Sequence, residues 1–247
     1  MKKDTTHMIR RAEHFKTILT GEGFLVGLIA GMVVLLYRVL LEYAGRAMNV
    51  ILGYARGNPA AAGGWFVLLV LMACIVGKLV KWEPMISGSG IPQVEGEMTG
   101  KLEQAWWRVL PAKFLGGFLS LLAGLSLGRE GPSIQIGAMT GKAVSKILDR
   151  GKTEEKYLLT CGASAGLAAA FHAPLAGVMF SLEEIHKNFS VSVLVSVMTA
   201  SITADYVSSQ FLGFHSVFRF DIGMEIQPRY YWHILILGVI LGLLGAF

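Results

Sequence analysis

Long apolar runs alternate along the chain with short polar or glycine-rich segments. Several runs approach the roughly 20 residues that an α-helix needs to cross a bilayer, and the others are shorter. The apolar runs, in chain order, cover residues 24–41, 65–80, 114–127, 157–171, 175–182, 191–206 and 230–247. The pattern predicts an all-α integral membrane protein in which some helices stop at membrane depth.

The segments between these runs predict where the chain turns. A helix-like run of mixed polarity covers residues 133–148. The predicted connecting segments are a polar, partly helical lead-in over residues 1–20, a glycine-bearing connection over residues 42–64 and a mixed connection over residues 214–229. Helices broken by glycine and proline at membrane depth are tolerated only where they line a cavity or are buried in protein.

Two of the breaks share one residue pattern. Gly88-Ser89-Gly90-Ile91-Pro92 and Gly128-Arg129-Glu130-Gly131-Pro132 each run from a glycine to a proline four residues later, and a helix follows each. A proline fits the first position of a helix, because the N–H that it lacks would be unpaired there. The other N–H groups at a helix start are unpaired and form its positive end, so each segment predicts an anion site. Each motif alone is also consistent with a helix-starting turn that binds no ligand.

Ser89 and Glu130 give the two predicted anion sites different chemistry. Ser89 adds a hydroxyl donor to the first site, and Glu130 places a carboxylate inside the second. An anion held by hydroxyl and backbone dipoles can lose its water without binding too tightly to leave, which selective conduction requires. Together the two motifs predict an anion pathway that carries its own tethered anion.

Composition and charge support a membrane protein. Of the 247 residues, 53% are hydrophobic and 16% are charged, and the mean hydropathy is +0.56. These values exclude an ordinary soluble domain. The first apolar run is too long and too late for a signal-peptide core, so we expect a retained span. Basic residues before this run predict a cytoplasmic N-terminus by the positive-inside rule, and they are Lys2, Lys3, Arg10, Arg11 and Lys16.

Residues that commonly hold metals or cofactors show no suitable pattern. Cys74 and Cys161 lie in apolar surroundings and indicate neither a disulfide nor a metal site. The histidines show no ligand spacing, and the sequence contains no nucleotide-binding motif. We therefore expect no metal, no cofactor and no nucleic-acid partner.

Further polar groups lie within or beside the apolar runs. Lys113 would either add positive potential along the pathway or snorkel to the interface. We expect His172, just before Pro174, to be packed or hydrogen-bonded rather than titrating. Glu183 and Glu184 end an apolar helical run, and adjacent residues do not share a helix face, so one could face solvent while the other lies against protein. The alternative is two solvated glutamates at a cytoplasmic end.

Three stretches, at residues 88–92, 128–132 and 168–177, occur together in an order that chance does not explain. In these stretches the chain resembles the CLC family of chloride channels and proton/chloride antiporters. The resemblance extends from about the first span to the end of the chain. It implies a fold of inverted repeats with broken and tilted helices, and a homodimer with a separate anion pathway in each subunit.

The resemblance also assigns roles by position. Ser89 would hold a central chloride ion, the backbone of residues 90–92 would line the inner end of the site, and that of residues 128–131 would line the outer end. Glu130 matches the family's external gating glutamate, whose carboxylate occupies the anion site until a proton removes its charge. Glu184 matches the internal proton-transfer glutamate, which passive channels of the family often replace by an apolar residue.

The predicted function is therefore voltage- or gradient-driven chloride transport by proton/chloride exchange, and not enzymatic. A passive chloride channel is the first alternative. An intramembrane enzyme acting on anionic lipid head groups is a distant one, because no Ser-His or metal constellation is visible. The expected partners are chloride, protons and membrane lipid, and the expected location is the bacterial inner membrane.

The chain departs from the family pattern in one respect. The family's site also needs a Gly-x-Phe-x-Pro helix start and a tyrosine hydroxyl from a second inverted half, and the sequence contains neither. We predict a cytoplasmic segment over residues 1–20, the first inverted half over residues 21–229, and a truncated first helix of the second half over residues 230–247. A fragment is favoured over a split polypeptide or a degraded gene, and the missing half would complete the site.

Overall fold

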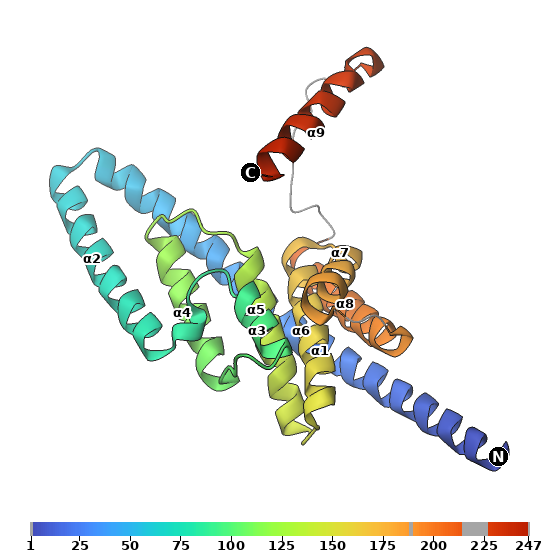
Figure 1. Cartoon of the computed structure of the whole chain (residues 1–247). Coiled ribbons are helices and arrows are strands. Elements are labelled where there is room, and N and C mark those ends of the chain that lie inside the picture. The colour runs from blue at the N-terminus through green and yellow to red at the C-terminus, as the bar shows by residue number, and fades with distance from the viewer. Residues whose placement is uncertain (1, 188–189, 214–226, 247) are drawn as a thin grey trace. The chain divides into compact units, whose positions relative to one another are not determined.

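The computed structural model describes residues 2–187, 190–213 and 227–246, with side chains from residue 15 onward. Every regular element within these residues is helical (Figure 1). The longer helices are α1 (Lys2–Arg56), α2 (Pro59–Trp82), α4 (Trp106–Leu122), α5 (Glu130–Ile147), α6 (Lys152–Phe171), α8 (Val191–Leu212) and α9 (Tyr231–Ala246). The shorter elements are the 3-10 helix η1 (Pro84–Ile86), α3 (Ile91–Met98), α7 (Pro174–Phe180), the π-helix η2 (Ser181–His186) and the 3-10 helix η3 (Pro228–Tyr230). The all-α prediction is confirmed.

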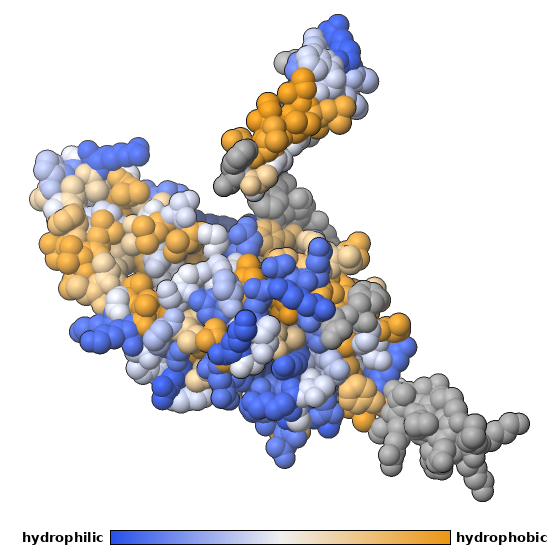
Figure 2. Space-filling view, viewed as in Figure 1, coloured by the Kyte–Doolittle hydropathy of each residue, from blue (hydrophilic) through white to orange (hydrophobic). Residues whose placement is uncertain are grey.

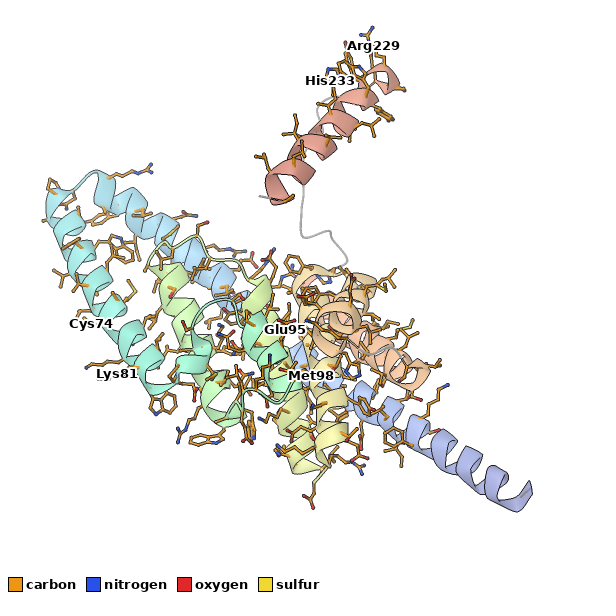
Figure 3. All side chains as sticks on the ribbon, in the orientation of Figure 1. Cys74, Lys81, Glu95, Met98, Arg229 and His233 are labelled. Atoms are coloured by element: carbon orange, nitrogen blue, oxygen red, sulfur yellow. The ribbon has the colours of Figure 1, made fainter. Side chains whose placement is uncertain are left out.

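Four of the described helices are long and apolar enough to cross a membrane. They are Phe15–Arg56 within α1, the whole of α2 and α8, and Pro228–Ala246 around α9. Apolar residues gather over α2 and over α9 (Figure 2). On α2 only Met72 is buried, and side chains such as those of Cys74 and Lys81 stand clear of the ribbon (Figure 3). An apolar helix exposed in this way suits contact with lipid.

The turn between the first two spans is much shorter than the sequence predicted. Residues 42–56 continue α1, and only Gly57 and Asn58 separate it from α2, so the predicted connection over residues 42–64 is wrong. The glycines of this segment misled the prediction, because one helical glycine costs only about 1 kcal/mol among good helix formers. The Asn58 side chain accepts the N–H groups of Ala60 and Ala61 and starts α2. Most of the predicted connection over residues 214–229 lies outside the described residues.

The helices α1 to α8 belong to one compact unit, and η3 with α9 belongs to a second. In the first unit, α1 packs closely on α8 through residues of small size. Gly23, Gly27 and Gly31 recur every four residues on α1, and a Cβ added to any of them would overlap the α8 backbone. The facing α8 residues are Ser196, Ala200 and Ala204. Small residues at this spacing are the usual means by which helices approach each other in a membrane.

A hydrophobic core separate from the contact between α1 and α8 positions the broken helices. It lies between η1, α3, α4, α5 and α6 and includes Val94, Val109, Ile134 and Met139. At its edge, Lys142 of α5 and Glu97 of α3 form an ion pair whose side chains are 3% and 8% exposed. The Lys142 ammonium also donates to the Gln104 carbonyl at 2.6 Å. This pair ties the short helix α3 to the long helix α5.

We expect Lys142→Met to destabilise the protein by about 3–5 kcal/mol, because the buried Glu97 carboxylate would keep the Gln104 N–H donor but lose its only cation among the described residues. The double variant with Glu97→Leu should recover most of that loss, since no uncompensated charge remains. The measurement is the free energy or midpoint of unfolding in detergent. The control is the exposed Arg46–Glu42 pair, with side chains 69% and 53% exposed, where Arg46→Met should change stability by less than about 1 kcal/mol. Equal losses in the two single variants would contradict the prediction.

Candidate functional site

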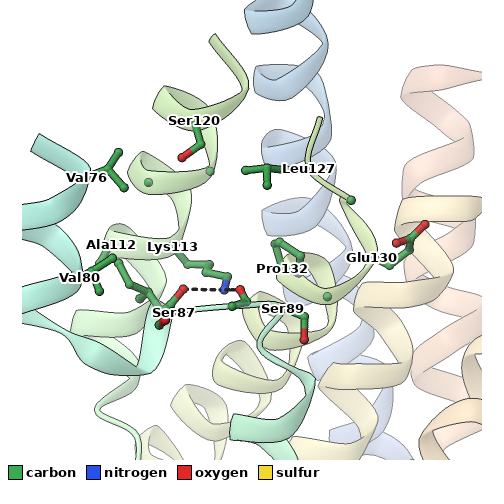
Figure 4. Close-up of a pocket in the computed structure, with 16 residues that line it drawn as sticks. Val76, Val80, Ser87, Ser89, Ala112, Lys113, Ser120, Leu127, Glu130 and Pro132 are labelled. Atoms are coloured by element: carbon green, nitrogen blue, oxygen red, sulfur yellow. Dashed lines mark hydrogen bonds between the residues drawn. The ribbon is translucent and has the colours of Figure 1, made fainter. Parts of the chain in front are cut away.

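A pocket of 520 Å³ lies between the loop after η1, helices α2 and α4, and the start of α5 (Figure 4). Ser89 lines it from the loop, and Lys113 lines it from α4. Gly128, Glu130 and Gly131 line it from the start of α5 and the segment just before it. The fold therefore brings together residues from the two glycine- and proline-containing motifs, which lie about forty positions apart in the sequence.

The backbone of the Ser89 loop takes a conformation that its two glycines allow. Gly88 and Gly90 have φ angles of +68° and +102°, a region that glycine enters without the steric cost that a Cβ brings. The Ser89 hydroxyl oxygen accepts the N–H of Ile91 at 3.3 Å. Because this contact uses only an acceptor lone pair, the hydroxyl proton of Ser89 stays available to donate to an anion.

The second motif contacts the first directly. A Cβ added to Gly131 would lie 2.5 Å from the Ser89 carbonyl oxygen and 2.8 Å from the Ser89 Cβ, so only glycine fits here. The sequence predicted that Pro132 is the first residue of its helix. Helix α5 instead begins at Glu130, so Pro132 is its third residue. The missing N–H of Pro132 is still one of the four that have no partner at a helix start.

Glu130 is exposed and is the first residue of α5. Its carboxylate lies beside the backbone of its own motif, since a Cβ on Gly128 would be 2.8 Å from Glu130 Oε2. The side chain projects away from Lys113 (Figure 4). A carboxylate at this position is attracted by the positive end of the helix dipole. The same end would attract a free anion, so the carboxylate and an anion would compete for one region.

Four predicted site residues of the two motifs do not line the pocket. The Arg129 guanidinium lies over the Phe171 ring, 5.6 Å from its centroid. Gly90 is buried against the side chain of Gln135. Ile91 and Pro92 are the first two residues of α3. These residues shape the backbone behind the pocket, and any contact that they make with an anion stays a prediction.

The position of Lys113 shows which of its two predicted roles is correct, adding positive potential along the pathway or snorkelling to the interface. Lys113 is 5% exposed, so it does not snorkel to the interface. Its Nζ donates to the carbonyl oxygens of Ile86 and Gly88, at 2.9 Å each. The ammonium is therefore held against the Ser89 loop, on the wall of the pocket.

Glu184 lies in the π-helix η2 and not among the residues that line the pocket. Both Glu183 and Glu184 are exposed, so the expectation that one of them packs against protein is wrong. The reason is the wide π turn, which buries Ser181, Leu182 and Ile185 instead. Lys187 pairs with Glu95 at 2.7 Å. This hydrogen bond, with a smaller Coulombic contribution from Glu184, raises the pKa of Lys187 above its usual value.

His172 is packed and hydrogen-bonded, as predicted. It ends α6 with a φ of +54°, and its Nδ1 lies 3.1 Å from Asp205 Oδ1 and 3.2 Å from Ser209 Oγ. Its Nε2 lies 3.1 Å from the Arg38 guanidinium. Because a guanidinium can only donate, Nε2 accepts and the ring proton is on Nδ1, directed toward Asp205.

Two glutamines that the sequence analysis did not single out hold the loop before Ser89. Gln135 Nε2 donates to the Met85 carbonyl at 2.8 Å and to Gln104 Oε1 at 2.7 Å. Gln93 Nε2 donates to the Ser87 carbonyl at 2.7 Å. The one sequence signal for Gln135 was its place between two isoleucines in a helical run, where a polar side chain needs a buried partner.

Comparisons with known proteins match this arrangement. The profile of the voltage gated chloride channel family matches residues 68–247. The H(+)/Cl(-) exchange transporters ClcA of Salmonella paratyphi B (strain ATCC BAA-1250 / SPB7) and Salmonella newport (strain SL254) are each 40% identical over 184 residues. The matched region covers 73% of this chain and 39% of each transporter, so the chain spans well under half the length of these relatives.

Two solved structures share the fold of this chain. A slow cyanobacterial Cl-/H+ antiporter superposes with a TM-score of 0.80 at 32% identity, over 92% of this chain and 54% of that one. A CLC-type fluoride/proton antiporter superposes with a TM-score of 0.71 over 93% of this chain and 55% of that one. At 22% identity this second similarity shows the fold alone. The chain belongs to the voltage gated chloride channel family, the CLC family.

Proposed function

We propose that this chain supplies part of a transporter that exchanges chloride for protons across a membrane. The observation that carries the proposal is the direct contact between Gly131 and Ser89. This contact sets a hydroxyl donor, a helix start and a carboxylate around one pocket. The relatives named above are exchangers and antiporters, which favours exchange over the passive channel alternative.

In this proposal Ser89 and nearby backbone N–H groups bind chloride, while Glu130 acts as a gate. As a carboxylate, Glu130 occupies the positive end of α5 and excludes chloride from it. Once protonated, it loses the charge that held it there, and chloride enters. Coupling follows because each opening of the pathway needs a proton at Glu130.

Glu184 supplies protons from the other side of the membrane in this proposal. Its exposed position on η2 suits exchange of protons with water. The protein would be a homodimer in the bacterial inner membrane, with the N-terminus of each chain in the cytoplasm. Chloride flux without chemical turnover would separate this proposal from an enzyme of lipid head groups.

We expect Glu184→Gln to abolish uphill proton movement while chloride continues to flow. The test uses liposomes that contain the complete transporter, by which we mean this chain joined to the further residues that its longer relatives carry. A chloride gradient is imposed, and proton and chloride fluxes are recorded together. Glutamine keeps the size of the side chain but cannot release a proton.

The adjacent Glu183→Gln variant is the matched control, because Glu183 is also exposed and lies on the same π-helix. It should keep wild-type coupling. Equal loss in both variants would contradict a specific role for Glu184. Chloride flux with no uphill proton movement in the wild type would favour the passive channel.

A further inference from the structure

Four consecutive carbonyl oxygens before Ser89, those of residues 85–88, each accept a hydrogen bond from one of three side chains, and these three side chains come from three different helices. Lys113 of α4 donates to the second and the fourth of them, at 2.9 Å each. Gln135 of α5 donates to the first at 2.8 Å, and Gln93 of α3 donates to the third at 2.7 Å. We call these three side chains the carbonyl clamp.

The clamp determines which backbone groups of the loop stay free. In a trans peptide the carbonyl and the following N–H point in opposite directions. Holding the Ser87 and Gly88 carbonyls therefore turns the N–H groups of Gly88 and Ser89 away from the donors. None of the hydrogen bonds in the described part of the chain uses the N–H of Gly88, Ser89 or Gly90. Successive unpaired N–H groups in a turn form a concave anion site.

Without such restraints this loop could easily reverse its polarity. Gly88 and Gly90 both have positive φ angles, and a glycine adopts other φ values at little steric cost. Rotation of the peptide between Gly88 and Ser89 would exchange an N–H for a carbonyl oxygen. A carbonyl oxygen carries partial negative charge, so it repels an anion and attracts a cation. The same glycines that make the loop fit an anion therefore make a restraint necessary.

Burial restrains two of the three clamp side chains. Lys113 is 5% exposed and Gln135 is 0% exposed. The orientation of the Gln135 amide is forced, since both of its Nε2 partners can only accept, so its nitrogen must face them. One of these partners, Gln104, is itself buried and donates to the Gln93 carbonyl at 3.1 Å. The two glutamines of the clamp are thus connected through a third.

We propose that Gln93 and Gln135 are positioning residues that maintain the anion affinity of the Ser89 site. With Lys113, they occupy the carbonyls of residues 85–88 and leave the loop N–H groups to face the anion. The inference rests on the proposed function and deepens it, because it makes the anion affinity of the same site depend on residues behind it.

The test is Gln93→Met in the complete transporter, which keeps the side-chain length and removes the donor. Gln93 is half-buried near the start of α3, so the variant should fold. Loss of one restraining hydrogen bond should weaken chloride binding, measured by isothermal titration calorimetry, about five- to tenfold. The KM for chloride should rise by the same factor, with the maximal rate unchanged. The matched control is Gln210→Met, at an exposed glutamine on α8, which should bind as the wild type does.

The second variant, Gln135→Met, should weaken chloride binding at least as much, since it frees the first carbonyl of the set. Ser89→Ala, which removes a direct donor, separates failure of the clamp from failure of the site. If Ser89→Ala weakens binding and both glutamine variants leave it unchanged, the clamp is wrong and the anion site stands. If Ser89→Ala also has no effect, the proposed site itself is wrong. If the variants keep the wild-type KM, and their maximal rate falls together with their unfolding temperature, the glutamines have only a structural role and the proposal is wrong.

Discussion

Replacing Glu130 by glutamine is expected to abolish proton-coupled transport and to leave a chloride flux that no longer responds to pH. Among the described residues that line the pocket, Glu130 is the only acid. Glutamine has the shape of the protonated side chain but cannot take up or release a proton. The side chain would lose its attraction to the positive start of α5, and the anion would meet no competing charge there.

The measurement is paired proton and chloride flux in liposomes at several pH values, with the complete transporter. Uphill proton movement should fall to the level of protein-free liposomes. The control is Glu103→Gln, at a glutamate whose side chain is 79% exposed, which should transport as the wild type does. If Glu130→Gln still drives protons uphill, the gate lies elsewhere.

The sequence predicted the site where the relevant signal was local. Glycine and proline restrict or free the backbone at their own positions, so the two breaks could be predicted from the sequence. The positive φ angles of Gly88 and Gly90 were seen only in the structure. The contact between the motifs was implied by the family resemblance. Its tightness at Gly131 is a property of the packed helices and could be seen only in the structure.

The misses come from forces that act between distant segments. Gln135 acts on a carbonyl 50 positions earlier, and no local pattern shows that this carbonyl needs a donor. Arg129 is directed by Phe171, a ring on another helix, and therefore does not point into the pocket. For Glu183 and Glu184, ordinary helical spacing left open whether one packs against protein or both face solvent, and the π turn leaves both exposed. At Gln135 and Arg129 the error appears because tertiary packing decides the direction of a side chain.

A larger side chain between α5 and α6 is expected to cause the largest loss of stability. Gly137 and Gly141 on α5 face Gly162 and Gly166 on α6. A Cβ on any of these four glycines would overlap backbone atoms of the other helix. Backbone cannot rotate away as a flexible side chain can, so the helices would have to separate. Overpacking usually costs about 1–3 kcal/mol, and we expect Gly162→Leu to exceed this range and to leave no folded protein.

The measurement is the yield of monodisperse protein in detergent, followed by its unfolding temperature. Gly63→Leu is the control, because a Cβ on that helical glycine would have nothing within 4 Å, and it should fold as the wild type does. If both variants fold equally well, the close approach of α5 and α6 is wrong. The smaller change Gly162→Ala should fold with reduced stability. Because α5 carries Glu130 and Gly131 at its start, this variant should also bind chloride more weakly, which would show that the helix contact positions the anion site.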